Sequence, residues 1–233
     1  ALKARPTKVS SKSVSPRAAL SSATLPVAPA ALTVVGQDVD GTAEVVGSYV
    51  AEDISWHGPH PIDDLKGIEA VINGFWRPFR TAFPDLRRRC DLLIGGHEHW
   101  VGAIGYFDGT FSQPWLGIPP SGQPTHIKYG EFSAVHDGKI VLTYIILDIL
   151  DVLRQAGYAL IPPSPGREGR VPGPASSDGV FFDSQDEAEG VKTLRTAKVM
   201  CSYLNQPECR PYWTEDMKWY GPSGIGTTIA REI

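Results

Sequence analysis

Asp148 carries a carboxyl group within an otherwise apolar stretch of the chain. Ile146 and Leu147 precede it, and Ile149 and Leu150 follow it. A carboxyl group in an apolar cavity is desolvated, which raises its pKa toward neutrality and suits it to general acid and base chemistry. The alternative role is structural, because Asp148 also opens a predicted helix and Asp is a favoured N-cap residue.

Glu131 is the second candidate carboxylate, and a hairpin turn predicts its position. Asp137-Gly138 is a preferred two-residue turn, so His136 is expected to pair with Lys139. This register predicts three facing pairs on one face of the sheet: Tyr129 with Ile146, Glu131 with Tyr144, and Ile127 with Asp148. Glu131 and Asp148 would then lie about 13 Å apart along the ladder. A β-bulge would shift this pattern.

Histidine and aromatic side chains supply the other candidate ligand contacts. The expected substrate-binding residues are His57, His60, Trp56, Trp76, Tyr129 and Tyr144. For the two histidines the alternative is a turn facing water, and for the two tryptophans it is the hydrophobic core. His97 and His99 flank Glu98 at strand spacing, but no clear third ligand accompanies them, so we predict no metal site.

The elements that must position these residues are helices followed by strands. Apolar residues recur at helical spacing from Ile68 to Ala82, with Pro78 expected to kink or shorten that helix. A shorter helix and a strand precede it. The later segments read as strands at 88–95, 99–107, 123–135 and 139–148, then a helix over 148–156. This order predicts an α+β domain with an antiparallel sheet.

The chain divides into four parts. Residues 1–37 are basic, rich in Ser, Ala and Pro and free of acidic residues, which is typical of an organellar transit peptide or of a disordered extension. Residues 38–160 form the predicted domain, and 161–184 form a Pro/Gly-rich linker. Residues 185–233 begin with a helix candidate at 185–204.

An internal repeat links the last part to the first domain. The windows 52–62 and 215–225 share Glu, Asp, Trp, Gly, Pro and Ile at a constant offset of 163 residues. An internal duplication explains this match better than chance does. Residues 185–233 are therefore expected to be a partial second copy of the domain.

Composition excludes several classes of function. The formal charge of -4 provides no broad basic field, and the run Arg87 to Arg89 is expected to be a solvent-facing strand edge rather than a nucleic-acid site. Three cysteines without a C-x-x-C motif indicate neither a disulfide framework nor a zinc knuckle. No apolar stretch is long enough to span a bilayer, and no nucleotide-binding fingerprint is present.

Three segments taken together resemble the SnoaL-like polyketide cyclase family. They are "WHGPHPIDDLKGIEAVINGFWRPFRTAFPDL", "GIPPSGQP" and "VHDGKIVLTYIILDILDVLRQAG", and the resemblance covers residues 45 to 157. It implies a nuclear transport factor 2-like cone, in which a curved, mostly antiparallel sheet wraps around helices and encloses an apolar pocket. Some relatives carry two such domains in one chain.

The resemblance also implies a chemistry. Such proteins close rings by intramolecular aldol condensation, with no metal or other cofactor, and Asp148 matches the family position seven residues before the Gln of the terminal helix. Glu131 stands where many relatives place another polar residue, often His, so the sequence departs from the pattern there. The implied partner is a hydrophobic small molecule, with Asp148 and Glu131 as catalytic candidates.

Two functional hypotheses follow. The first is a cofactor-independent cyclase or isomerase. The second is a non-catalytic binding or assembly subunit of the same fold, either a homodimer or part of a large complex, because fold does not fix function. The basic N-terminus predicts a chloroplast or a mitochondrion as the compartment, and the cytoplasm is the alternative.

Overall fold

The computed structural model describes residues 47–96, 99–171, 173, 179–180, 186–204 and 206–229. The predicted extension at 1–37 lies outside these residues, as do most of the first predicted helix and His97. The strands are β1 (Val50–His57), β2 (Asp64–Lys66), β3 (Arg87–Gly96), β4 (Trp100–Thr110), β5 (Pro124–His136), β6 (Lys139–Leu147), β7 (Lys218–Tyr220) and β8 (Thr227–Ile229). The helical segments are α3 (Ile68–Val71), η2 (Ile72–Trp76), α4 (Arg77–Ala82), α5 (Ile149–Gln155), α6 (Glu187–Ser202) and η3 (Pro207–Tyr212).

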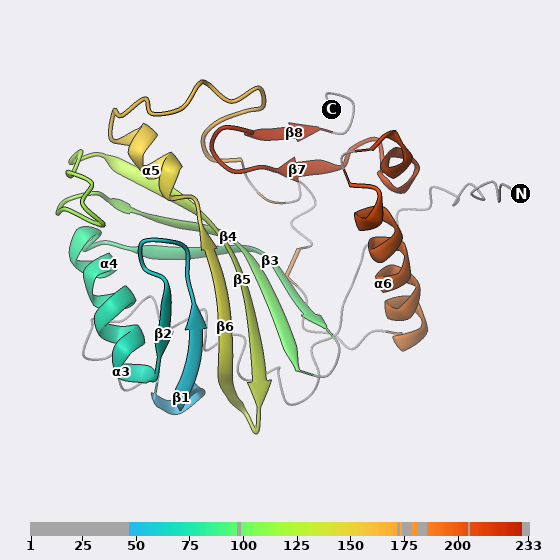
Figure 1. The fold of residues 1–233 in the computed structure, drawn as a ribbon, viewed down its shortest axis with the longest axis horizontal. Coiled ribbons are helices and arrows are strands. Elements are labelled where there is room, and N and C mark those ends of the chain that lie inside the picture. The colour runs from blue at the N-terminus through green and yellow to red at the C-terminus, as the bar shows by residue number, and fades with distance from the viewer. Residues whose placement is uncertain are drawn as a thin grey trace, which may run out of the picture.

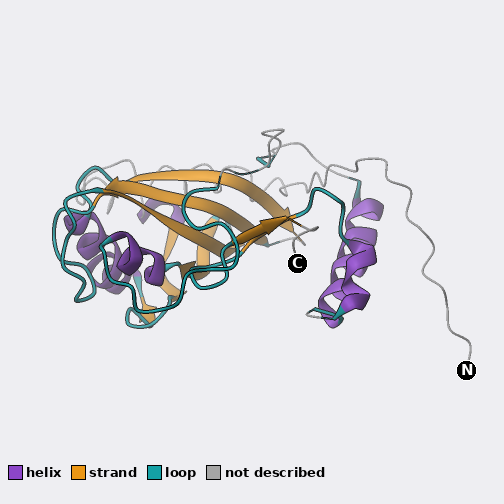
Figure 2. Cartoon of the chain, turned by 90° about the horizontal axis from the view of Figure 1, so that it is seen from above, coloured by secondary structure: helices purple, strands orange, loops and turns teal. Residues whose placement is uncertain are grey.

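A six-stranded sheet in the order β2-β1-β6-β5-β4-β3 forms the body of the molecule. Its neighbours pair antiparallel except β1 and β6, which are parallel. The sheet is curved, α3 and α4 lie together at one end of it, and α6 stands apart (Figures 1 and 2). The α+β class and the antiparallel strands predicted from the sequence are confirmed.

The predicted register between β5 and β6 is wrong by one residue. His136 pairs with Lys139, as the Asp-Gly turn predicts, and Val135 pairs with Ile140. A bulge at Val141 then shifts the register, because an extra residue on one strand moves every later pair. Beyond the bulge Glu131 pairs with Ile145 and not with Tyr144.

This shift changes which side chains share a face. Glu131 and Tyr129 lie on the buried inner face, and Tyr144 and Ile146 project from the outer face, where both are exposed. The predicted grouping of all four residues on one face is therefore wrong. Inward and outward positions alternate along a strand, so a slip of one residue exchanges the two faces.

The helix from Ile68 to Ala82 continues past Pro78 by means of a π-helical turn. That turn, η2, comes immediately before α4, in which Pro78 occupies the start of the first turn. A proline there is tolerated, because it lacks only an N–H that the beginning of a helix leaves unpaired. The inward residues of the segment pack against the sheet, and Phe75 and Phe79 are 1% and 0% exposed.

The C-terminal part folds as a helix followed by a small hairpin. Helix α6 confirms the helix expected at 185–204. Strands β7 and β8 then pair antiparallel and lie across the outer face of the large sheet beside the linker (Figure 1). In the linker, Val171 exchanges two hydrogen bonds of 3.0 Å with the Tyr106 hydroxyl, which attaches this segment to β4.

Within the described ranges, no helix is both long and apolar enough to cross a bilayer.

Candidate functional site

A cluster of polar side chains lies on the inner face of the sheet. From β3, Arg88 donates a 2.8 Å hydrogen bond from Nη2 to Glu131 Oε2 and a 3.0 Å hydrogen bond from Nε to the Tyr129 hydroxyl. The Arg88 side chain is 3% exposed and that of Glu131 is 11% exposed. Alternation along β3 explains this placement, since Arg87 and Arg89 then point outward.

The position of Arg88 corrects the expectation that the whole arginine run faces solvent. Its guanidinium carbon lies 4.5 Å from the centre of the Tyr129 ring and 5.6 Å from that of Phe107. Burial lowers the pKa of Arg88, but the attraction of Glu131 and the interactions with Tyr129 and Cys90 together outweigh this effect, and the net shift of the pKa is upward. Arg88 is therefore a fixed buried cation.

Two hydroxyl groups extend the cluster toward β6. Ser133 donates a 3.1 Å hydrogen bond to Glu131 Oε1, and its hydroxyl lies 2.9 Å from that of Thr143. Burial raises the pKa of Tyr129 well above its ordinary value, although Arg88 opposes the rise. The Tyr129 phenol is consequently a neutral hydroxyl at any physiological pH.

Aromatic rings surround this cluster. Phe107 packs against Tyr129 with a centroid distance of 4.7 Å and against Phe79 at 5.3 Å. Trp115 stacks on Phe79 at 4.8 Å. The interior of the cone is thus a low-dielectric environment, in which charges and dipoles act more strongly than in water.

Asp148 faces the C-terminal hairpin. Its Oδ1 caps α5 by accepting a hydrogen bond from the Asp151 N–H at 3.2 Å, and its Oδ2 accepts one from the Ser223 N–H at 2.8 Å. Neighbouring Lys128 donates a 2.6 Å hydrogen bond to the Gly221 carbonyl. Burial raises the pKa of Asp148, and the hydrogen bond from Ser223 opposes the rise. Asp148 therefore combines the N-cap role with attachment of the hairpin.

The family of this domain follows from a comparison with known protein families. Residues 36–156, more than half of the chain, match the family described as SnoaL-like polyketide cyclase. The chain belongs to the SnoaL-like polyketide cyclase family.

Solved structures support the fold. A candidate SnoaL-like polyketide cyclase from Jannaschia sp. CCS1 has a TM-score of 0.50 at 21% identity, covering 58% of this chain and 93% of that one. IdmH, a candidate polyketide cyclase from Streptomyces antibioticus, has a TM-score of 0.49 at 23% identity, with coverage of 56% and 98%. The likeness to the Jannaschia protein shows the fold alone, which is the predicted nuclear transport factor 2-like cone. No curated protein matches the chain.

The remaining predicted site residues of this SnoaL-like domain are dispersed. Trp56 and Trp76 are buried core residues, and each ring packs against Phe75, at 4.8 and 4.6 Å. His57 stacks on Tyr144 at 4.5 Å on the outer face, and its Nδ1 lies 2.8 Å from Asp64 Oδ1. His60 is exposed in the turn after β1, where its Nδ1 lies 3.2 Å from an Asp63 carboxylate oxygen. Of the predicted residues, the structure brings Glu131 and Tyr129 together through Arg88 on the inner face, and His57 and Tyr144 together on the outer face.

Sequence reasoning missed Arg88, Ser133 and Thr143. The signal for Arg88 was available, because the middle residue of three in a strand faces opposite to its neighbours. Alternation also gave a signal for Ser133, which lies two residues from Glu131 on the same strand, whereas Thr143 gave none until the bulge was known. In the part of the chain that the structure describes, no group of three or more His, Cys, Asp or Glu side chains could hold a metal ion.

A second polar cluster of the SnoaL-like domain fixes α5 to β5. The Gln155 side chain exchanges hydrogen bonds with the backbone N–H and carbonyl of His126, at 3.1 and 2.7 Å. Asp151 accepts hydrogen bonds from Gln155 and Arg154. The His126 ring is half-buried, and its Nε2 lies 3.7 Å from Asp151 Oδ2. Burial lowers the pKa of His126, with Asp151 acting in the opposite direction.

Breaking the buried ion pair of Arg88 and Glu131 should strongly destabilise the fold. Glu131→Gln should reduce the free energy of unfolding by about 3–5 kcal/mol, because it leaves the Arg88 charge buried without a partner. Replacing both residues, Arg88→Met with Glu131→Leu, should restore much of that loss. Urea unfolding at pH 7 measures both effects. A loss below about 1 kcal/mol for the single variant would contradict a desolvated pair.

His126 should make stability depend on pH. Its folded-state pKa is lowered, so the unfolded chain binds the proton first, and stability should fall as pH drops below the ordinary value of about 6.5. His126→Gln should flatten the decline of the free energy of unfolding between pH 7 and pH 5. His60→Gln, at an exposed turn, is the matched control. Equal slopes in the parent and in His126→Gln would contradict the assignment.

Proposed function

We propose that this SnoaL-like chain binds a hydrophobic, carbonyl-containing small molecule inside the cone and catalyses acid–base chemistry on it. The observation that supports this proposal is the joining of a carboxylate, a guanidinium and a phenol, from Glu131, Arg88 and Tyr129, within an aromatic interior. The family assignment supports the same class of substrate.

Each side chain has a definite role in the proposal. Glu131 removes a proton from a carbon next to a carbonyl group, and the resulting enolate attacks a second carbonyl of the same molecule. The alkoxide that forms then takes back the proton held by Glu131. Arg88 and Tyr129 donate hydrogen bonds to the oxygen on which negative charge develops. A carboxylate offers about four acceptor positions, so Glu131 retains capacity beyond its bonds to Arg88 and Ser133. The chemistry uses side chains of this chain alone.

Asp148 has a structural role in this proposal. Both of its oxygens accept backbone hydrogen bonds, and one of them anchors the β7–β8 hairpin. The catalytic candidate among the two predicted carboxylates is therefore Glu131.

A second candidate function is that of a non-catalytic subunit of an assembly. It is favoured by the deep burial of Tyr129, which a ligand can reach only if neighbouring rings move. It is also favoured by a row of exposed apolar side chains on the outer face of the sheet, made up of Ile94, Trp100, Phe132, Tyr144 and Ile146.

Turnover of linear aromatic polyketone esters by the full chain tests the proposal. Glu131→Gln should lower the rate by about 10²–10⁴-fold, as expected for loss of a general base. Tyr129→Phe, which preserves the ring packing, should lower it at least tenfold. Asp148→Asn should keep most of the rate while increasing hydrogen exchange at Ser223. Circular dichroism confirms that each variant is folded.

Two outcomes contradict the proposal. One is undiminished turnover in Glu131→Gln. The other is the absence of both turnover and ligand-induced thermal stabilisation across the ester panel, together with migration of the endogenous chain in a large assembly. That second result would favour the non-catalytic subunit.

A further inference from the structure

The β7–β8 hairpin reproduces the β1–β2 hairpin at a constant offset of 163 residues. Trp56 pairs with Leu65 in the first, and Trp219 pairs with Thr228 in the second. The flanking pairs match in the same way: Ser55 with Lys66 and Lys218 with Ile229, then His57 with Asp64 and Tyr220 with Thr227. The register of the two hairpins is therefore identical.

The turns of the two hairpins also agree. In the first, the Pro59 carbonyl accepts hydrogen bonds from the N–H groups of Ile62 and Asp63, at 2.9 and 3.2 Å. In the second, the Pro222 carbonyl accepts them from Ile225 and Gly226, at 3.0 and 2.8 Å. Matching residues, pairing and turn bonds over the same stretch indicate one duplicated unit.

A helix covers the inner face of the first hairpin. Trp56 is 3% exposed, and the ring of Phe75 lies 4.8 Å from it. The helix backbone comes so close that a Cβ built on Gly74 would lie 2.9 Å from a methyl carbon of Leu65. The segment α3–η2–α4 is thus what buries this tryptophan.

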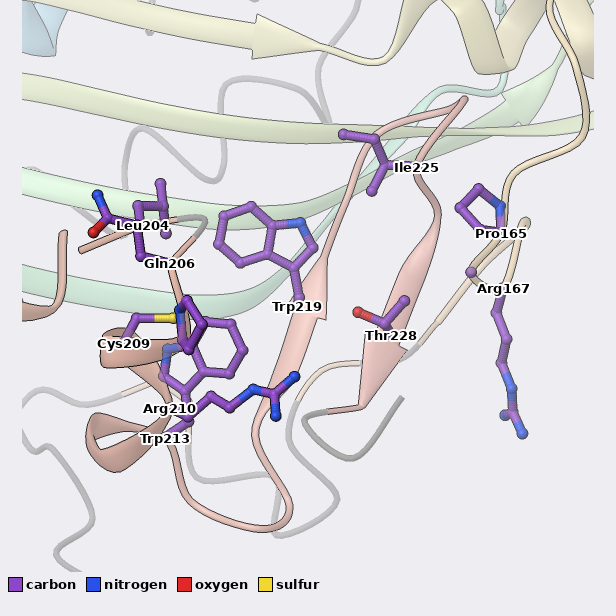
Figure 3. Close-up of a pocket in the computed structure, with 12 residues that line it drawn as sticks. Pro165, Arg167, Leu204, Gln206, Cys209, Arg210, Trp213, Trp219, Ile225 and Thr228 are labelled. Carbon is purple, nitrogen blue, oxygen red and sulfur yellow. The ribbon is translucent and has the colours of Figure 1, made fainter. Parts of the chain in front are cut away.

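The corresponding face of the second hairpin borders an open groove. Trp219 is 39% exposed and Ile225 is 49% exposed. Together with Thr228 they line a groove of about 880 Å³. These three residues are the counterparts of Trp56, Ile62 and Leu65. Figure 3 shows the groove, with Cys209 and Trp213 at one end and Pro165 and Arg167 at the other.

We propose that this groove binds an amphipathic helix with aromatic residues on its inner face, seated on Trp219 as Ile68–Ala82 is seated on Trp56. The internal copy identifies the occupant, because the same hairpin in the same register already holds such a helix in this chain. The bound helix would complete the beginning of a second SnoaL-like unit. This inference is independent of the proposed catalysis.

Affinity should be modest when the helix is supplied as a separate peptide. A short helix is only marginally stable in water, so binding must also order the peptide. The gain comes from covering the Trp219 and Ile225 side chains, since burial of large apolar surface is the main favourable contribution. Aromatic side chains of the helix should therefore dominate the interaction.

Fluorescence anisotropy of a labelled peptide with the sequence of residues 67–84, titrated with the full chain, tests the inference. Saturable binding is expected. Trp219→Ala should weaken it at least tenfold, and Ile225→Ala should weaken it several-fold. Phe132→Ala is the matched control, because Phe132 is 51% exposed on the outer face of the sheet; it should leave the affinity within twofold.

The peptide provides a second, independent variant. A peptide carrying Phe75→Ala should lose at least tenfold in affinity, and it leaves the protein itself unchanged. The inference is overturned by the absence of saturable binding, by equal affinity in Trp219→Ala, or by equal affinity of the two peptides. A loss of binding in Phe132→Ala alone would likewise overturn it, since the peptide would then cover the sheet.

Discussion

The extra residue at Val141 in β6 is the constraint on which the arrangement of the domain depends. It shifts the β5–β6 register by one residue, so that Glu131 faces Ile145 and shares the interior with Thr143. Without the shift, Tyr144 and Ile146 would enter the cone, and Thr143 would leave the hydrogen-bonded network of Ser133 and Glu131. The β-bulge is thus what adds β6 to the buried polar cluster that β3 and β5 form.

The two faces of the sheet therefore differ in their side chains and in what covers them. The inner face holds the buried ion pair among aromatic rings, where an unpaired charge would be strongly unfavourable. The outer face is divided between exposed apolar side chains and the region covered by the linker and the β7–β8 hairpin. Asp148 and Lys128 lie at that covered region and hold the hairpin through its backbone. Asp148 therefore joins the domain to the segment that follows it.

Much of the fold could be predicted from the sequence, because periodicity and turn residues are local signals. The Asp137-Gly138 turn fixed the first pair of the hairpin correctly, and the apolar spacing from Ile68 to Ala82 indicated the buried helix. The site was harder to predict. No Gly or Pro marks the bulge at Val141. The predicted inner and outer faces of β6 beyond it are therefore the reverse of the observed ones. The sequence left open whether Asp148 is catalytic or caps a helix. Its contact with Ser223, a residue far along the chain, favours the structural role.

The measurement that tests the central claim most directly is a crystal structure of the full chain soaked with a hydroxyanthraquinone carboxylate as a planar, carbonyl-containing probe. The account predicts density inside the cone, with a probe oxygen within hydrogen-bonding distance of the Tyr129 hydroxyl or the Arg88 guanidinium, and with Asp148 still bonded to Ser223. Density beside Asp148, with the hairpin displaced and the Arg88–Glu131 pair untouched, would contradict it.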